Sequence, residues 1–262
     1  MKKLLIAAVS SIALGSGAFA QVPITNVITN AFDFGANYTG GGPGWTNGAN
    51  AGFGFGAWTI NNNDNPAITN FAGNLIIDPA GAGISGMSAN SFGLYANGLS
   101  APFVNAGRGI SNALSIGQTL SFQWGVNFNS GAKGFNLLSG GTQILNLNLG
   151  GGSDNITLNG ESVLSAYGTN SFYVGITRTD ASTYTVFSTS SRTNGTLGGF
   201  STNVSSGLAA DNFQIYASSL SSGDAQQPYF NDFSVVPEPS TYALLALSAA
   251  GLGAHLIRRR RR

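Results

Sequence analysis

The sequence lacks cysteine entirely, and its single histidine, His255, lies close to the C-terminus. Without cysteine the chain has no disulfide, thiolate metal site or thiol catalysis. With no histidine elsewhere, the body of the chain cannot hold a Ser-His-Asp triad or a histidine-ligated zinc ion. Its stability must come from packing and backbone hydrogen bonds, and we expect neither a metal nor a cofactor.

Charged residues are also scarce, at 8% of the chain, and they are unevenly placed. Seven of the eleven basic residues lie at the two ends, so residues 21–236 keep four, against nine acidic residues. Nucleic acids are bound by clustered Lys and Arg. The acidic balance of this stretch therefore argues against nucleic acid as a partner.

The N-terminus has the three parts of a secretory signal peptide: a basic region, an apolar stretch and a small-x-small cleavage site. These parts are Lys2 and Lys3, residues 4–14, and Ala18-Phe19-Ala20. The apolar stretch is too short for an ordinary membrane span. Ala18 and Ala20 define the expected cleavage site. We expect residues 1–20 to be removed there, so that the mature chain starts at Gln21.

The C-terminus combines a proline-rich motif, an apolar segment and a basic cluster. The motif is Pro237, Glu238 and Pro239, and the apolar segment covers residues 241–257. As a helix this segment would be roughly 25 Å long, the lower limit for crossing a bilayer. The basic residues that flank the membrane are Arg258, Arg259, Arg260, Arg261 and Arg262. The positive-inside rule places them in the cytoplasm and the body on the far side.

These three elements, in this order, resemble the PEP-CTERM sorting signal of Gram-negative bacteria. The resemblance covers residues 237–262 and implies recognition by an exosortase, a membrane transpeptidase-like protease that removes the tail. It implies export machinery as a partner, transient residence in the inner membrane, and delivery to the cell surface or extracellular matrix. The alternative is a plain C-terminal anchor. Bodies of this family are diverse, so the signal indicates a destination and not an activity.

Between the two ends, residues 21–236 alternate large apolar residues with small or polar ones, the period of a β-strand. Asn-Gly and Gly-Gly pairs separate these runs and favour tight hairpins. The pattern predicts one antiparallel all-β domain, a β-sandwich or jelly roll in preference to a closed barrel. The closing strands, at residues 211–213 and 229–233, resemble those of the jelly-roll, lectin-like sandwiches of exported bacterial proteins. The expected strands cover residues 120–128, 144–149, 172–176, 184–187, 213–216 and 229–235, with weaker candidates at 58–60, 75–77 and 92–95.

The clearest run predicts a core face that a single strand presents to the interior. That face contains Leu120, Phe122, Trp124, Val126 and Phe128. The Gly-rich stretch 35–56 is interpreted as an irregular loop of the domain or an N-terminal arm. Trp45, within it, is the tryptophan that we expect to be exposed as a platform for sugars.

Candidate catalytic and metal-binding groups in the body are weak. Lys133, the only body lysine, is interpreted as part of a solvated turn and not as a catalytic base. Glu161, the only body glutamate, would need Asp154 as a partner for glycoside hydrolysis. Residues 81–86 match a Gly-rich nucleotide motif, but no amphipathic helix follows, which favours a flexible loop.

Residues 61–65 offer oxygen ligands that suit calcium, with Asp33, Asp211 and Asp232 as possible additions, although Asx-rich turns usually bind nothing. We predict no catalytic site. The favoured function is a non-enzymatic surface or matrix protein with a structural, adhesive or polysaccharide-associated role. The alternative is a carbohydrate-active enzyme with an unrecognised carboxylate pair.

Overall fold

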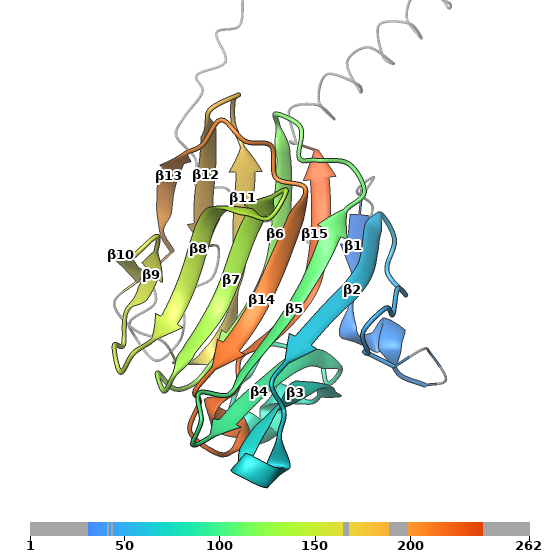
Figure 1. Ribbon diagram of the computed structural model, residues 1–262. Coiled ribbons are helices and arrows are strands. Elements are labelled where there is room, and N and C mark those ends of the chain that lie inside the picture. The colour runs from blue at the N-terminus through green and yellow to red at the C-terminus, as the bar shows by residue number, and fades with distance from the viewer. Residues whose placement is uncertain (1–30, 41, 43, 165–167, 189–198, 238–262) are drawn as a thin grey trace, which may run out of the picture.

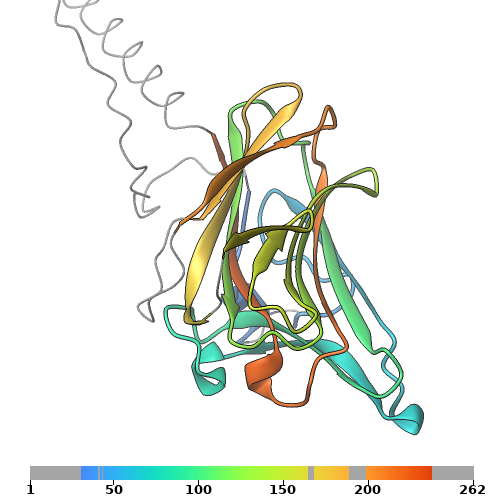
Figure 2. The ribbon, with the colours of Figure 1, turned by 90° about the vertical axis from the view of Figure 1, so that its left-hand side faces the viewer.

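The computed structural model describes residues 31–40, 42, 44–164, 168–188 and 199–237, and these form two antiparallel β-sheets packed face to face (Figures 1 and 2). In spatial order, sheet A contains β13 (Ser201–Ser205), β12 (Thr183–Ser188), β11 (Gly168–Arg178), β6 (Gln118–Val126), β15 (Tyr229–Pro237), β4 (Ser91–Gly98) and β3 (Asn70–Ile77), and β1 (Ala31–Asp33) also pairs with β15. Sheet B contains β10 (Glu161–Leu164), β9 (Ile156–Leu158), β8 (Thr142–Gly150), β7 (Ala132–Ser139), β14 (Asn212–Ser218), β5 (Phe103–Ile110) and β2 (Phe55–Asn62). The predicted β-sandwich is confirmed.

Four short 3-10 turns join the strands: η1 (Gly35–Tyr38), η2 (Pro66–Ile68), η3 (Pro79–Ala82) and η4 (Asp224–Gln226). Every strand expected from alternation corresponds to a strand of the structure. Sequence reasoning missed β1, β5, β7, β9, β10 and β13. In β5, for example, the inward residues include Ala106 and Arg108, so the alternation of large apolar residues is absent.

The core lies between the sheets and is rich in aromatic rings. Phe122 of sheet A stacks on Phe135 of sheet B with ring centroids 4.2 Å apart, and Phe213 and Phe233 stack across the sheets at 4.8 Å. All four are fully buried. Because such pairs add to the free energy gained from burying the rings, they hold the two layers together.

The core face predicted for residues 120–128 is correct for four of its five residues. Leu120, Phe122, Trp124 and Val126 are fully buried, whereas Phe128 is 41% exposed. Strand β6 ends at Val126, so the chain leaves the sheet before the alternation in the sequence stops. The prediction that Phe128 belongs to the core is therefore wrong.

The Gly-rich stretch is packed against the sandwich. Trp45 is 5% exposed and contacts Trp58 and Phe92 edge-on, with centroids 5.5 and 4.8 Å away. The expectation of Trp45 as an exposed sugar platform is wrong, because its ring packs into the aromatic core. Tyr38 of η1 is also buried and contacts Phe92.

The two ends of the described domain meet on β15. The first part of β15 pairs with β4 at Tyr229 and Phe230, and its later part pairs with β1, where Ala31 faces Val235. Along the opposite edge β15 pairs with β6 as far as Pro237, which faces Gln118. The strand is thus flanked on both sides over much of its length.

The expected signal peptide, residues 1–20, and the apolar segment 241–257 lie outside the described residues. Within the described part of the chain, no helix is long and apolar enough to cross a bilayer.

Candidate functional site

The outward residues of sheet B form a polar row across five strands. Backbone register places Thr59 of β2 and Gly107 of β5 in line with Gln214 of β14, Asn136 of β7 and Asn146 of β8. We call these five residues the amide row. At about 4.8 Å per strand the row is roughly 19 Å long. The outward face therefore presents a line of uncharged polar side chains that is interrupted at Gly107.

Three side chains of the row, those of Gln214, Asn136 and Asn146, are linked by directed hydrogen bonds. Asn146 donates to Asn136 Oδ1 at 2.7 Å, and Asn136 donates to Gln214 Oε1 at 3.1 Å. Asn146 also donates to the Tyr216 hydroxyl, which donates to Asn148 Oδ1, both at 2.9 Å. Burial raises the pKa of Tyr216 to about 12, so its hydroxyl keeps its proton. The network holds the amide planes in fixed orientations.

One end of the amide row opens into a hollow of about 220 Å³. Strands β2, β5, β7 and β14 supply its lining: Thr59, Asn61, Gly107, Arg108, Gly109, Leu138, Asn212, Phe213 and Gln214. Of these, Arg108 and Phe213 have side chains directed into the core, where both are buried. The groups that remain on the outside are the Thr59 hydroxyl, three amide side chains, the Leu138 side chain and bare backbone at the two glycines.

A buried ion pair lies on the inner side of the same strands. Arg108 pairs with Asp33 of β1, and neither side chain is exposed. The carboxylate also accepts hydrogen bonds from the Tyr38 hydroxyl at 3.0 Å and from Trp58 Nε1 at 3.2 Å. Burial raises the pKa of Asp33, and the Arg108 charge opposes this shift. The guanidinium lies 5.3 Å from the Phe55 and Trp58 ring centroids. This network fixes β1 and β5 beneath the hollow.

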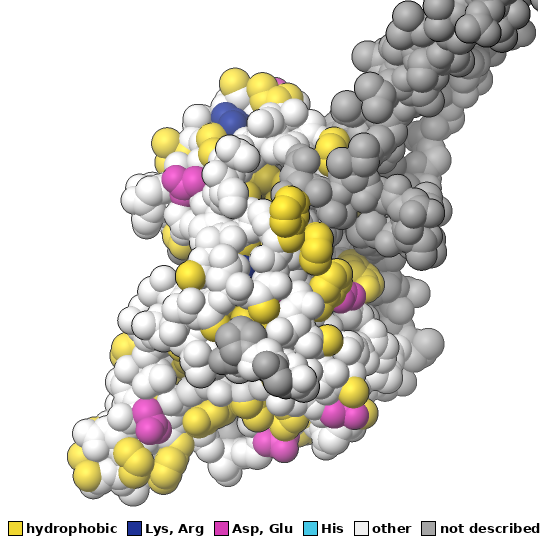
Figure 3. Space-filling view, turned by 90° about the vertical axis from the view of Figure 1, so that its right-hand side faces the viewer, with side chains coloured by type: hydrophobic (Ala, Val, Ile, Leu, Met, Phe, Trp, Pro, Cys, Tyr) yellow, Lys and Arg dark blue, Asp and Glu magenta, His cyan; other side chains and the backbone are white. Residues whose placement is uncertain are grey.

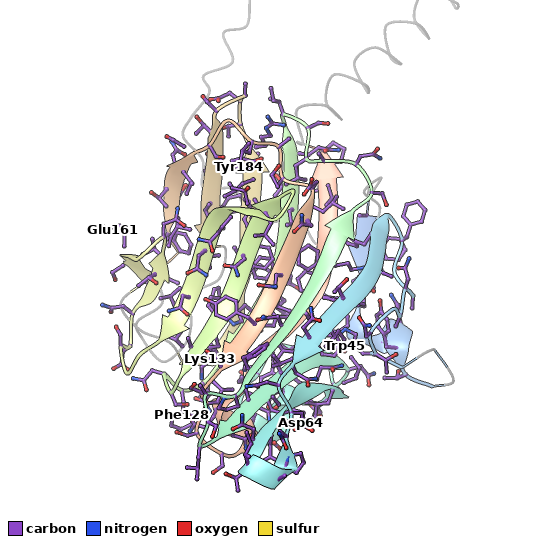
Figure 4. All side chains as sticks on the ribbon, in the orientation of Figure 1. Trp45, Asp64, Phe128, Lys133, Glu161 and Tyr184 are labelled. Carbon is purple, nitrogen blue, oxygen red and sulfur yellow. The ribbon has the colours of Figure 1, made fainter. Side chains whose placement is uncertain are left out.

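Lys133 is placed differently from the sequence expectation. It is fully buried and donates to the carbonyl oxygens of Phe128 and Gln226, at 2.7 and 2.6 Å. Burial lowers its pKa to about 7. The interpretation as a solvated turn is wrong, because Lys133 occupies an inward position of β7 and reaches carbonyls at the end of the sandwich (Figure 4).

The two acids considered for hydrolysis are both exposed and lie outside the hollow. Glu161 begins β10, at the outer edge of sheet B (Figure 4). Asp154 accepts a hydrogen bond from Asn129 at 2.6 Å in a turn. Neither residue lines the hollow.

The aspartates considered for calcium are separated. Asp33 binds Arg108, Asp211 accepts from the Gly140 amide at 3.0 Å, and Asp232 accepts from the Tyr173 hydroxyl at 2.8 Å. Among the described residues, no three acidic, histidine or cysteine side chains gather as a metal site.

The amide row was missed at the sequence level, although a signal for it was present. In the stretch 144–149 and in 213–216 the apolar phase indicated the core, while the polar phase contained Asn146, Asn148, Gln214 and Tyr216, which form the outer face. The polar positions of an alternating strand specify the exposed surface as directly as the apolar ones specify the core.

The sorting motif begins at the sheet. Pro237 is the last residue of β15, while Glu238, Pro239 and the arginine cluster lie outside the described residues, as do Ala18 and Ala20. Their roles in sorting and cleavage remain predictions from the sequence.

Comparison with protein families matches residues 235–262 to the PEP-CTERM protein-sorting motif. The chain thus carries the signal of proteins that are exported and sorted by an exosortase. The matched region starts within β15 and includes Pro237, Glu238 and Pro239. A search of curated proteins finds no match.

Solved structures with related folds share little sequence with this chain. They include a sialidase, which matches with 8% identity and a TM-score of 0.45, covering 70% of this chain and 17% of the sialidase. The Ca²⁺-bound exoplasmic/lumenal domain of VIP36 matches with 7% identity and a TM-score of 0.40, covering 69% of this chain and 83% of that domain. Alginate lyase AlgAT5 of polysaccharide lyase family 7 matches with 11% identity and a TM-score of 0.38, covering 56% of this chain and 77% of the lyase. No activity follows from these matches.

Proposed function

We propose that this protein is a non-catalytic component of the cell surface or extracellular matrix that associates with polysaccharide through the outer face of sheet B. The observation that carries the proposal is the amide row, in which Gln214, Asn136 and Asn146 on three adjacent strands form a hydrogen-bonded line of uncharged donors and acceptors. Sugar hydroxyls both donate and accept hydrogen bonds, and amide side chains offer the same two capacities. The sorting signal at residues 235–262 supports this proposal, because it indicates an exported protein.

The surface chemistry supports a binding role over a catalytic one. The outward groups around the hollow are mainly hydroxyls and amides, whereas the only body glutamate stands at the edge strand β10. Figure 3, which views the molecule from the side of β1 and β2 at the edge of the sandwich, shows only scattered charged side chains there as well. The hydroxyl and amide groups on the outer face of sheet B can form hydrogen bonds to a ligand but no ion pairs with it.

The test is a polysaccharide array run beside a hydrolysis screen with the purified full-length protein. We expect binding to at least one polysaccharide without turnover. Turnover that the Glu161→Gln variant abolishes would overturn the proposal in favour of a carbohydrate-active enzyme. Absence of binding to every polysaccharide would remove the proposed role.

The sorting part is tested separately, by intact-mass analysis of protein recovered from the surface or medium of the native host. We expect a mature form from about Gln21 to the region of Pro237, without the arginine cluster. Full-length protein held in the inner membrane, with Arg262 present, would instead indicate a permanent anchor.

A further inference from the structure

Two glycines, Gly107 and Gly109, form the floor of the hollow, and the backbone conformation at these positions does not require glycine. Neither Gly107 nor Gly109 has a positive φ. A Cβ atom built at Gly107 would come no closer than 3.5 Å to another heavy atom, the Phe213 carbonyl oxygen. At Gly109 the nearest atom is the Asp211 carbonyl oxygen, at 3.9 Å. Both distances are ordinary contacts, so a Cβ atom fits at either position without displacing a neighbour.

Glycine weakens a strand interior and often marks a place where a ligand approaches the backbone closely. Here the missing side chains create the hollow itself, because Gly107 and Gly109 occupy outward positions of β5. On neighbouring strands, Thr59 and Gln214 carry side chains at the level of Gly107. The hollow is thus a gap in an otherwise continuous polar row.

The size of the hollow limits what enters it. Pockets for complete small-molecule ligands usually measure about 300–1,000 Å³, and this one measures about 220 Å³. It suits one unit of a longer molecule that continues along the surface. We propose that the hollow over Gly107 and Gly109 is a subsite for one sugar unit of an uncharged polysaccharide whose chain continues along the amide row. This inference rests on the proposed polysaccharide-binding function.

Hydrogen-bonding groups around the hollow match sugar hydroxyls. The Thr59 hydroxyl and the Asn61 amide have no hydrogen-bond partner among the described residues. The Gln214 Oε1 atom is occupied by the Asn136 donor, which leaves the Gln214 NH₂ group to donate to a ligand. The site therefore offers oriented donors and acceptors without any charge.

The distribution of charge decides the class of polysaccharide. Arg108 is buried against Asp33, Lys133 is fully buried, and Arg178 donates to a backbone carbonyl from sheet A. Among the described residues, no basic side chain faces outward at the amide row. The charge next to the hollow is that of Asp211, which Asn212 contacts at 2.6 Å. A polyanion would lose hydration here without gaining a cationic partner, whereas a neutral chain loses less.

The experiment measures binding of the full-length protein in a polyoxyethylene detergent, which has no sugar head group to compete. The probes are soluble neutral glucans, mannans and galactans, with alginate and hyaluronate as polyanions. The Gly107→Val variant fills the hollow. Gly81→Val is its matched control, because Gly81 lies in η3, has no positive φ, and would carry a Cβ atom with nothing within 4 Å of it. Gln214→Ala removes the oriented donor as an independent variant.

We expect the wild type and Gly81→Val to bind at least one neutral polysaccharide equally well. Gly107→Val should bind at least tenfold more weakly with an unchanged melting temperature, and Gln214→Ala several-fold more weakly. Unchanged binding by both variants would place the site elsewhere and overturn this inference while leaving the proposed function standing. Binding of the wild type to polyanions alone would contradict the inference that the polysaccharide is uncharged. Failure of the wild type to bind any probe would overturn the proposed function as well.

Discussion

Replacing Asp33 with alanine should destabilise the domain more than any other single acidic substitution among the described residues. The Asp33 carboxylate is fully buried, and it neutralises the equally buried Arg108 guanidinium. Its removal leaves that cation without a counter-charge in the core and deprives the Tyr38 hydroxyl and Trp58 Nε1 of an acceptor. Breaking a buried pair in this way costs about 3–5 kcal/mol of unfolding free energy.

The matching measurement is a double-mutant cycle with Arg108→Met, followed by tryptophan fluorescence in urea. Because Met leaves no charge behind, the double variant should be more stable than the sum of the single effects allows, with a coupling of about 2 kcal/mol or more. Asp154→Asn is the control, since Asp154 is exposed, and it should change stability by less than about 0.5 kcal/mol. Additive single effects would show that Asp33 and Arg108 do not act as a pair.

Two further predictions concern the core and its buried lysine. Phe122→Ala should lower the free energy of unfolding by about 3–5 kcal/mol, because the ring is fully buried and stacked. Ser121→Ala should lower it by about 1 kcal/mol, through loss of the 2.8 Å hydrogen bond to Ser234. Equal losses for the two variants in urea titrations would contradict the assigned strand phase. Lys133 has a pKa of about 7 in the folded protein and 10.5 in the unfolded protein. Between these two pH values the unfolded state binds more protons than the folded state. The free energy of unfolding should therefore rise with pH, by at most about 1.4 kcal/mol per pH unit. Urea titrations between about pH 7.5 and 9.5 should show this slope, and Lys133→Met should lack it; an identical slope in that variant would assign the effect to another group.

The sequence predicted the fold because the strongest strands carry large apolar residues at alternate positions. Strand β6 is the clearest example, with Leu120, Phe122 and Trp124 all inward. The prediction ended two residues too late, at Phe128, since periodicity alone does not indicate where a chain leaves its sheet. Strand β7 was missed because Lys133 occupies an inward position, and a buried lysine breaks the apolar pattern.

The binding face was harder to predict than the fold. Gly107 belongs to none of the strands expected from the sequence, yet in β5 it creates a hollow because it has no side chain. Trp45 looked exposed because of its glycine neighbours, and tertiary contacts with Trp58 and Phe92 bury it. Both features depend on which strands lie side by side, and local sequence does not contain that information.

The position of β15 also determines how the domain bears mechanical load. While the tail is held at the membrane, drag on the body is transmitted through Pro237 and along β15. The hydrogen bonds from β15 to β6 and β1 run perpendicular to the strand, so a pull along its axis loads them simultaneously in shear. A strand pulled perpendicular to its axis would instead peel away one bond at a time. The domain is therefore tethered through a strand that resists extraction.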